Sequence, residues 1–209
     1  LSAGLYGKCV SNAEGEKQID ATGLAVAPGF INMMSHAEVS LLIDGNSQAD
    51  IRQGITLEVL GEGSMGPLND KMKQDWKDQM KRNPDWQFDI DWTTLGEYLE
   101  SLQRRGISPN VASFVGANTV RIHELGYANR APDAEELERM KSLIKQAMEE
   151  GAMGTTTALI YAPDNYATTE ELIELSKVAA PYGGMYISHM RSEGNNILNA
   201  VDETIRIAR

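Results

Sequence analysis

The sequence has 209 residues, of which 42% are hydrophobic and 23% are charged, a composition typical of a globular protein with one sizeable core. Its formal net charge of -11 repels nucleic-acid phosphates and anionic lipid headgroups, so we expect no nucleic-acid or membrane partner and favour a small molecule or a protein. The single cysteine, Cys9, excludes an internal disulfide and a four-cysteine zinc site, so histidines and carboxylates would have to hold any metal.

Along the chain, short apolar runs alternate with longer helical patterns, which is the signature of parallel strands joined by helices. The segment before residue 22 is broken by glycines and is not expected to be helical. Five strands are then expected, at 25–34, 55–60, 111–115, 154–160 and 185–189. The pattern predicts the α/β class, with right-handed crossovers between strands.

The helices between the later strands have clear start signals. Asp133 followed by Glu136 resembles a capping box and predicts a helix that ends near residue 150. Thr168 followed by Glu171 repeats the signal for a helix that stops at a pair of glycines. Apolar residues at helical spacing predict a last helix over 198–208.

One connection, 66–92, is far longer than the roughly 4 to 6 residues usual in compact domains, and it holds all three tryptophans. Residues 69–81 can form a helix with Trp76 on its apolar stripe. The segment is either a substrate lid or a surface excursion that packs its aromatic side chains against the exterior. The sequence leaves both interpretations open.

Two strand ends have the residue types of an active site. The apolar run that starts at Met185 leads directly into His189, and the second strand ends in Gly61-Glu62-Gly63. At the carboxyl end of parallel strands, such side chains lie where enzymes of this architecture place their chemistry. A histidine there can equally be a hydrogen-bonded structural residue, so the interpretation depends on what accompanies it.

The motif Ile19-Asp20-Ala21-Thr22-Gly23, followed by Ala27-Pro28-Gly29-Phe30-Ile31, resembles the amidohydrolase superfamily and, within it, the N-acyl-D-amino-acid deacylases, or D-aminoacylases. The resemblance continues through 116–121, through 151–154 with 159–161, and through 189–194 with 200–203. It implies that 1–27 is a remnant of a small β domain. Residues 28–209 would then be the first part, about five β/α units, of a metal-dependent-hydrolase TIM barrel with 66–92 as an insertion.

The resemblance also implies the chemistry. The substrate would be a small-molecule N-acyl amino acid or a related amide. A divalent metal, with zinc as the first choice, would activate the water that attacks its non-peptide amide bond. It implies metal ligands at His189, at His36 and at Glu62, where many D-aminoacylases have a cysteine. It implies substrate contacts at Tyr161, Arg191 and Asn118.

The first strand departs from the family pattern. The family's aspartate falls on Asn32, and the first histidine of its His-x-His pair falls on Met34, whose thioether is a poor zinc ligand. Only His36 remains of the pair, so the number of bound metals, one or two, stays open. His123 matches no ligand position and is expected to be structural or solvent-facing, whereas Arg121 is expected near the pocket mouth with Asn118.

A (β/α)8 barrel needs about 250 residues, and the repeating pattern here stops after five units at Arg209. The catalytic aspartate that moves protons would lie beyond Arg209, so the chain by itself is expected to have weak or no activity. It is expected to be a fragment lacking a carboxy-terminal half, or a chain that closes its barrel by assembling with partners, such as a homo-oligomer.

Two alternative functions remain at this point. A non-catalytic amidohydrolase-like binding module is suggested by the loss of a ligand at Met34, and metal analysis would distinguish it. A cyclic-amide hydrolase similar to dihydroorotase would use the same metal chemistry, and a substrate screen would distinguish it. The sequence also leaves open the acyl group, the substrate side chain and the compartment, cytoplasm or periplasm.

Overall fold

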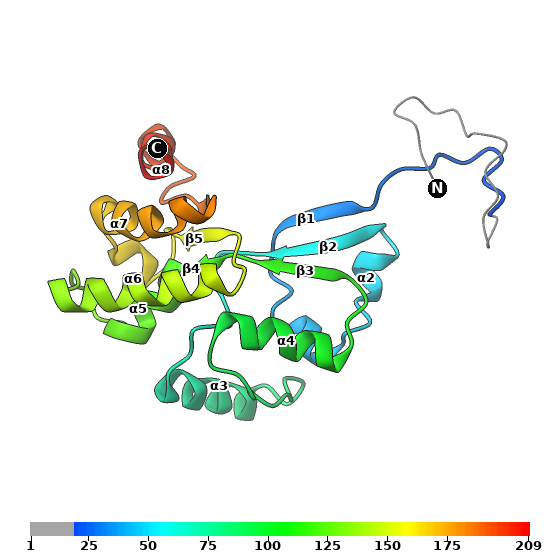
Figure 1. The fold of residues 1–209 in the computed structure, drawn as a ribbon, viewed down its shortest axis with the longest axis horizontal. Helices are drawn as coiled ribbons and strands as arrows, with labels where there is room; N and C mark the ends of the chain where they lie inside the picture. The colour runs from blue at the N-terminus through cyan, green and yellow to red at the C-terminus, as the bar shows by residue number, and fades with distance from the viewer. Residues whose placement is uncertain (1–18) are drawn as a thin grey trace.

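The computed structural model describes residues 19–209 as an α/β fold in which parallel strands alternate with helices (Figure 1). The described strands form two three-stranded sheets, ordered β1-β2-β3 and β4-β5-β6, with every pairing parallel. The strands are β1 (Phe30–Ser35), β2 (Ile55–Leu60), β3 (Asn110–Ser113), β4 (Val115–Gly116), β5 (Gly154–Ala158) and β6 (Met185–His189). The predicted α/β class is therefore confirmed.

The second and fifth predicted strands, now β2 and β6, are confirmed with the predicted bounds. The first begins later than predicted, after Pro28, which cannot donate a ladder hydrogen bond. The third is divided at Phe114 into β3 and β4, where the Phe114 amide donates to the Leu60 carbonyl (3.0 Å) and the Met153 amide donates to the Ser113 carbonyl (2.9 Å). The two sheets are therefore joined at this bend.

Helices follow most of the strands along the chain. Figure 1 shows α3 and α4 together on one side of β3, whereas α5 to α8 gather around β4 and β5. The longer helices are α3 (Asp70–Arg82), α4 (Leu95–Arg105), α5 (Ala117–Leu125), α6 (Ala134–Glu149), α7 (Thr169–Ala179) and α8 (Ile197–Ala208). The short ones are α1 (Ser40–Ile43), α2 (Gln48–Ile51), η1 (Asp164–Tyr166) and η2 (Ala180–Tyr182).

The predicted helix starts are confirmed, with one difference. Asp133 and Glu136 form a complete capping box at α6, each carboxylate accepting the other residue's backbone N–H at 2.8 Å. At α7, Thr168 accepts from the Glu171 amide at 3.2 Å, but the Glu171 carboxylate does not return to Thr168. It accepts two hydrogen bonds from buried Arg121 instead, at 2.7 and 2.8 Å, because a buried guanidinium needs a partner of opposite charge.

The long connection between β2 and α4 is anchored at several points. Asn69 caps α3 by accepting from the Met72 amide at 2.9 Å, and its side-chain nitrogen donates to the His123 carbonyl on α5 at 2.8 Å. Trp92 is buried, and its indole N–H donates to the Met65 carbonyl at 2.6 Å. The predicted helix over 69–81 is confirmed as α3, and the whole segment packs on the rest of the chain.

The main core lies between the strands and the helices that cover them. On α6 the predicted stripe is buried, with Met140, Ile144, Ala147 and Met148 facing inward. Each such large apolar side chain contributes about 1.5–3 kcal/mol to folding. Every helix among residues 19–209 is too short or too polar to cross a lipid bilayer.

The division into domains stays a prediction. Most of the expected β-domain remnant, 1–27, lies outside the described residues, and the described part, 19–27, contains neither strand nor helix.

Candidate active site

The carboxyl ends of β2 and β6 bring Glu62 and His189 together. Glu62 Oε1 lies 2.9 Å from His189 Nδ1, although 127 positions separate the two residues in the chain. Both side chains are largely buried, with 19% and 20% of their surface exposed. In the low dielectric of such a site, a carboxylate attracts an imidazole more strongly than it does in water.

His36, in the loop after β1, approaches the same carboxylate. Its Nε2 lies 3.6 Å from Glu62 Oε1, and its side chain is 66% exposed. One carboxylate oxygen is therefore close to both imidazoles. The three residues expected to bind metal come from three separate strand ends, and the fold places them together.

The backbone at Glu62 has a conformation that is unusual for a residue with a side chain. Its φ is 69°, in the left-handed region. The Glu62 amide donates to Thr156 Oγ1 on β5 at 2.9 Å, which helps to hold this conformation. Such a backbone costs about 1–2 kcal/mol for a non-glycine residue and often marks a functional position. The geometry directs the Glu62 carboxylate toward the two histidines at the cost of local stability.

A cavity of about 320 Å3 opens beside these side chains. Tyr161 and Asn118, two of the three expected substrate contacts, line it. The Tyr161 ring meets the His189 ring edge to face, with centroids 5.4 Å apart and an interplanar angle of 88°. The full lining is His36, Glu38, Val39, Gly61, Glu62, Gly63, Ser64, Met65, Trp76, Asn118, Thr119, Ala158 and Tyr161.

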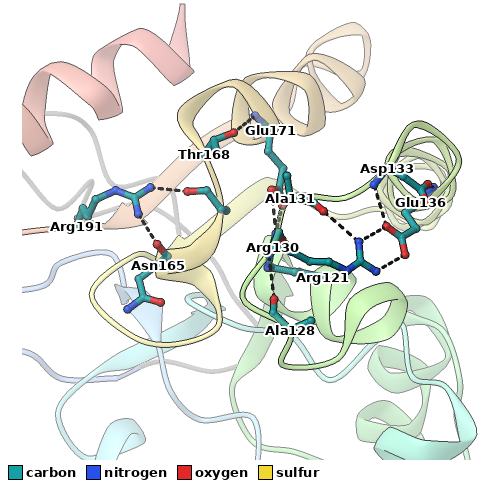
Figure 2. A network of polar contacts seen from close by, with 11 residues as sticks. Arg121, Ala128, Arg130, Ala131, Asp133, Glu136, Asn165, Thr168, Glu171 and Arg191 are labelled. Carbon is teal, nitrogen blue, oxygen red and sulfur yellow. Dashed lines mark hydrogen bonds and ion pairs between the residues drawn. The ribbon is translucent and has the colours of Figure 1, made fainter.

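Arg191, the third expected substrate contact, is not part of this lining. Its guanidinium donates two hydrogen bonds of 2.9 Å to Glu203 and one of 2.9 Å to the Ala167 carbonyl. It donates another, also 2.9 Å, to the Asn165 carbonyl (Figure 2). All three of its nitrogens are used within the chain. In this structure Arg191 therefore ties the loop before α7 to α8.

Arg121 is also away from the position expected for it. It is 1% exposed rather than at the pocket mouth, and it pairs with Glu171 and with the carbonyls of Ala128 and Arg130 (Figure 2). The sequence could not distinguish the two locations, because an arginine near a strand end can either bind substrate or form a buried ion pair within the fold. His123 lies on α5 beside Glu124, with Nδ1 2.9 Å from Glu124 Oε1, and does not line the cavity.

Two carboxylates, one lining the cavity and one buried on β2, were not singled out by sequence. Glu38 lines the cavity, and burial raises the pKa of its carboxyl from 4.5 to about 7, with the charge of Glu62 adding to the increase. Glu58 on β2 is fully buried, and its Oε2 accepts from the side-chain amide of Asn32 at 2.8 Å, whereas its Oε1 has no partner. No sequence signal marked either residue, because neither belongs to a recognisable motif.

The donor set suits a divalent cation such as zinc in its chemistry. Imidazole nitrogen and carboxylate oxygen are both common zinc ligands. His189 Nε2 is buried without an aligned hydrogen bond, although Glu193 Oε1 lies 3.1 Å away. Within residues 19–209, however, no group of three His, Cys, Asp or Glu side chains has the arrangement of a metal site. The described residues therefore fit part of a metal site, centred on Glu62.

Comparison with known proteins identifies relatives along most of the chain, although no family model matches it. Over 202 residues the chain is 35% identical to D-aminoacylase from Alcaligenes xylosoxydans xylosoxydans, an alignment that covers 96% of the chain and 41% of that protein. The chain therefore spans about two fifths of the length of this relative.

The fold is similar to that of solved deacylase structures. One solved structure is of a D-aminoacylase said to define a novel subset of amidohydrolases. The alignment covers 86% of this chain and 38% of the D-aminoacylase chain, with a TM-score of 0.73 and 34% identity. Another D-aminoacylase structure, 31% identical, concerns a binuclear metal centre with one-metal activation and second-metal attenuation. A third structure is of N-acyl-D-glutamate deacylase from Bordetella bronchiseptica, complexed with zinc and a phosphonate inhibitor. The alignment covers 87% of this chain and 38% of the deacylase chain, with a TM-score of 0.72 and 27% identity.

Proposed function

The chain belongs to the N-acyl-D-amino-acid deacylase family of amidohydrolases, and from that premise we propose that it supplies part of a metal-dependent active site that hydrolyses the amide bond of an N-acyl amino acid. The observation that carries the proposal is the position of Glu62 Oε1, 2.9 Å from His189 Nδ1 and 3.6 Å from His36 Nε2. The three residues come from three strand ends that meet at one edge of the fold, where enzymes of this class place their chemistry.

We further propose that residues 28–209 form the first part of a (β/α) barrel, with 66–92 as an insertion, and that 1–27 belong to a small β domain. The support is topological. The strands are parallel and follow one another in chain order, and the two sheets are joined where β3 bends into β4. Closed barrels of this type are built from strands in that order.

Glu62, His189 and His36 would supply part of the metal's ligands. A divalent cation such as zinc, when bound, polarises the amide carbonyl and lowers the pKa of water that attacks it. The chain's own contribution is to hold the donors in place. The left-handed backbone at Glu62 aims the carboxylate, and the Tyr161 ring packs edge-on against His189 and restricts its orientation.

The number of metals follows from the first strand. Met34 stands where the family has the first histidine of its pair, and a thioether does not replace imidazole as a zinc ligand. We therefore propose one metal per chain. The observation that one metal activates and the second attenuates a related D-aminoacylase is compatible with a working site of this kind.

Zinc analysis of the 209-residue chain tests the proposal. After incubation with zinc and removal of excess by gel filtration, elemental analysis should give about one zinc per chain, which Glu62→Ala and His189→Ala should each lose. His123→Ala is the matched control, since that histidine also pairs with a glutamate, at 2.9 Å, but outside the cavity. A wild-type chain that binds no zinc, or variants that retain it, would contradict the metal site and favour a non-catalytic binding module.

Hydrolysis is the second measurement. The chain with added zinc should be assayed against N-acetyl-D-amino acids and against a cyclic amide such as dihydroorotate. Even weak turnover of the N-acetyl-D-amino acids that disappears in His189→Ala supports a deacylase site. Turnover of the cyclic amide alone would instead identify a cyclic-amide hydrolase.

A further inference from the structure

The loop between β5 and α7, residues 159–168, places Tyr161 in the candidate site. Tyr161 lines the cavity together with Glu62, and its ring meets the His189 ring edge to face, with centroids 5.4 Å apart. Tyr161 is nevertheless 56% exposed, so side chains packed around the ring do not by themselves fix it. Its position therefore depends on the backbone of the loop.

The backbone of this loop turns where it leaves β5. The Tyr161 amide donates to the Ala158 carbonyl, and the Asn165 amide donates to the Tyr161 carbonyl, each at 2.9 Å. Ala158 is the partner of His189 in the ladder between β5 and β6, and the Leu159 amide donates to the His189 carbonyl at 2.9 Å. The turn that contains Tyr161 is therefore built directly on the strand pair that includes His189.

Asp164 closes this turn from the interior. It is 1% exposed, and its Oδ2 accepts a hydrogen bond from the Ala158 amide at 2.5 Å. Its other oxygen, Oδ1, is buried without a hydrogen-bond partner among residues 19–209. Burying a carboxylate with one unpaired oxygen is costly, and a single bond to a backbone amide does not offset that cost. Stability alone therefore does not explain an aspartate here, and such exceptions to the packing rules are expected at functional sites.

The charged groups around Asp164 have other partners. Arg121 of α5, Glu171 of α7 and Arg191 after β6 act on its carboxyl electrostatically. Arg121 and Glu171 pair with each other at 2.7 Å. Arg191 donates to two carbonyls of the loop that lie beyond Asp164, so it fixes the second half of the loop. Within the described part of the chain, Asp164 is the residue whose side chain holds the first half.

We propose that Asp164 is a positioning residue. By closing the turn it holds the Tyr161 ring against His189, and the ring keeps that imidazole oriented toward Glu62. Asp164 is not part of the cavity lining, so it acts through Tyr161 and not by contact with metal or substrate. The inference rests on the proposed function, since it takes His189 as a metal ligand.

Zinc affinity, measured by competition with a zinc-sensitive dye, tests this role. Asp164→Ala should weaken zinc binding to the 209-residue chain by about tenfold, the lower end of the effect of residues that orient metal ligands. Asp164→Asn, which keeps an acceptor for the Ala158 amide, should restore most of the affinity. Tyr161→Ala should cause a similar loss, and adding Asp164→Ala to it should cause no further loss, because the first residue acts through the second.

Asp133→Ala is the matched control for a general loss of stability. Asp133 also accepts a backbone hydrogen bond, from the Glu136 amide at 2.8 Å, but at the start of α6 and outside the cavity. The variant should lower the free energy of unfolding and leave zinc affinity unchanged. A loss of zinc affinity as large as that of Asp164→Ala would show that the measurement reports stability and would overturn the positioning role.

Hydrogen exchange of the metal-free chain tests the loop itself. In Asp164→Ala the amides of 158–165 should exchange at least about tenfold faster than in the wild type, because the Ala158 N–H loses its buried acceptor. In Asp164→Asn the exchange rate of the same amides should stay close to that of the wild type. Residues 137–147 of α6 should exchange equally in all three proteins.

Exchange and zinc content together separate this inference from the proposed function. If the wild type binds zinc but Asp164→Ala binds it as tightly, or loses the same factor when Tyr161→Ala is present, the positioning role is wrong and the metal site stands. A wild type that binds no zinc contradicts the metal site. In that case faster exchange that Asp164→Asn reverses supports the hold of Asp164 on the loop, and unchanged exchange overturns it. If circular dichroism shows that Asp164→Ala is unfolded, Asp164→Leu, which fills the space without an acceptor, replaces it.

Discussion

Glu62 at the end of β2 and His189 at the end of β6 face each other, with Oε1 and Nδ1 2.9 Å apart. The same oxygen lies 3.6 Å from His36 Nε2. Side chains that converge from separate strand ends on one partly buried oxygen are held by the fold rather than by local sequence. Because the distances and exposures of the two histidines differ, we expect their substitutions to reduce zinc affinity by different amounts.

The two histidines should not contribute equally to metal binding. His189 is mostly buried and close to Glu62, whereas His36 is two-thirds exposed and farther away. We expect His189→Ala to abolish zinc binding and His36→Ala to weaken it by a smaller factor, because an exposed ligand is less well preorganised. Competition with a zinc-sensitive dye gives both affinities. Equal losses would show that the two imidazoles are equivalent ligands.

Restoring the family histidine should add a second metal. In Met34→His the imidazole pair of the first strand is complete, and zinc stoichiometry should rise from about one to about two per chain. The substitution is compatible with the backbone, since Met34 has φ of 59° and histidine is among the residues enriched in that region. Met33→His is the control, because it adds a histidine one position away. Two zinc ions in both variants would indicate nonspecific binding.

The strain at Glu62 can be separated from its function. Glycine adopts φ of 69° freely, whereas alanine does not, so Glu62→Gly should be more stable than Glu62→Ala by about 1 kcal/mol. Both variants should lose zinc. Urea unfolding in the presence of a chelator measures the stability difference without a contribution from metal. If the two variants unfold at the same urea concentration, the backbone at this position is not strained.

The buried ion pair between Arg121 and Glu171 should be important for stability. Both side chains are nearly inaccessible, with exposures of 1% and 4%, so removing one partner leaves an uncompensated charge. Glu171→Ala should lower the free energy of unfolding by about 3–5 kcal/mol. Glu170→Ala, which breaks the exposed pair with Arg206, is the matched control and should have a much smaller effect. Similar losses in the two variants would argue against a buried pair.

Stability should fall as pH rises because of Asp164. Burial raises the pKa of this carboxyl from 3.8 to about 7, although the Ala158 amide and Arg121 oppose the increase. Between about pH 4 and 7 the folded state retains a proton that the unfolded state has released, so the free energy of unfolding decreases through that range and levels off above it.

Asp164→Asn should remove that dependence. The variant should gain stability relative to wild type as pH increases from 4 to 7, while the acceptor for the Ala158 amide is kept. Chemical denaturation at several pH values measures the difference. A constant difference across the range would mean that Asp164 ionises normally in the folded protein.

Much of the fold could be predicted from the sequence because its signals are local. The bounds of β2 and β6 and the caps of α6 and α7 depend on residues within a few positions of one another. The family resemblance, carried by short motifs, is confirmed by relatives that align over nearly the whole chain. Where a side chain had two partners to choose from, as Glu171 did between Thr168 and Arg121, the local signal predicted the wrong one.

The sequence by itself determined the positions of β2 and β6, the helix starts and the residue types at the strand ends, since each follows from hydrophobic periodicity or capping chemistry over a short window. Only the tertiary structure decided that Glu62 and His189 meet, that Arg121 and Arg191 are engaged within the chain, and that Trp76 lines the cavity rather than the exterior. These outcomes depend on how segments separated by tens of residues pack. Burial and pairing of charges are set by that packing, and no short stretch of sequence contains them.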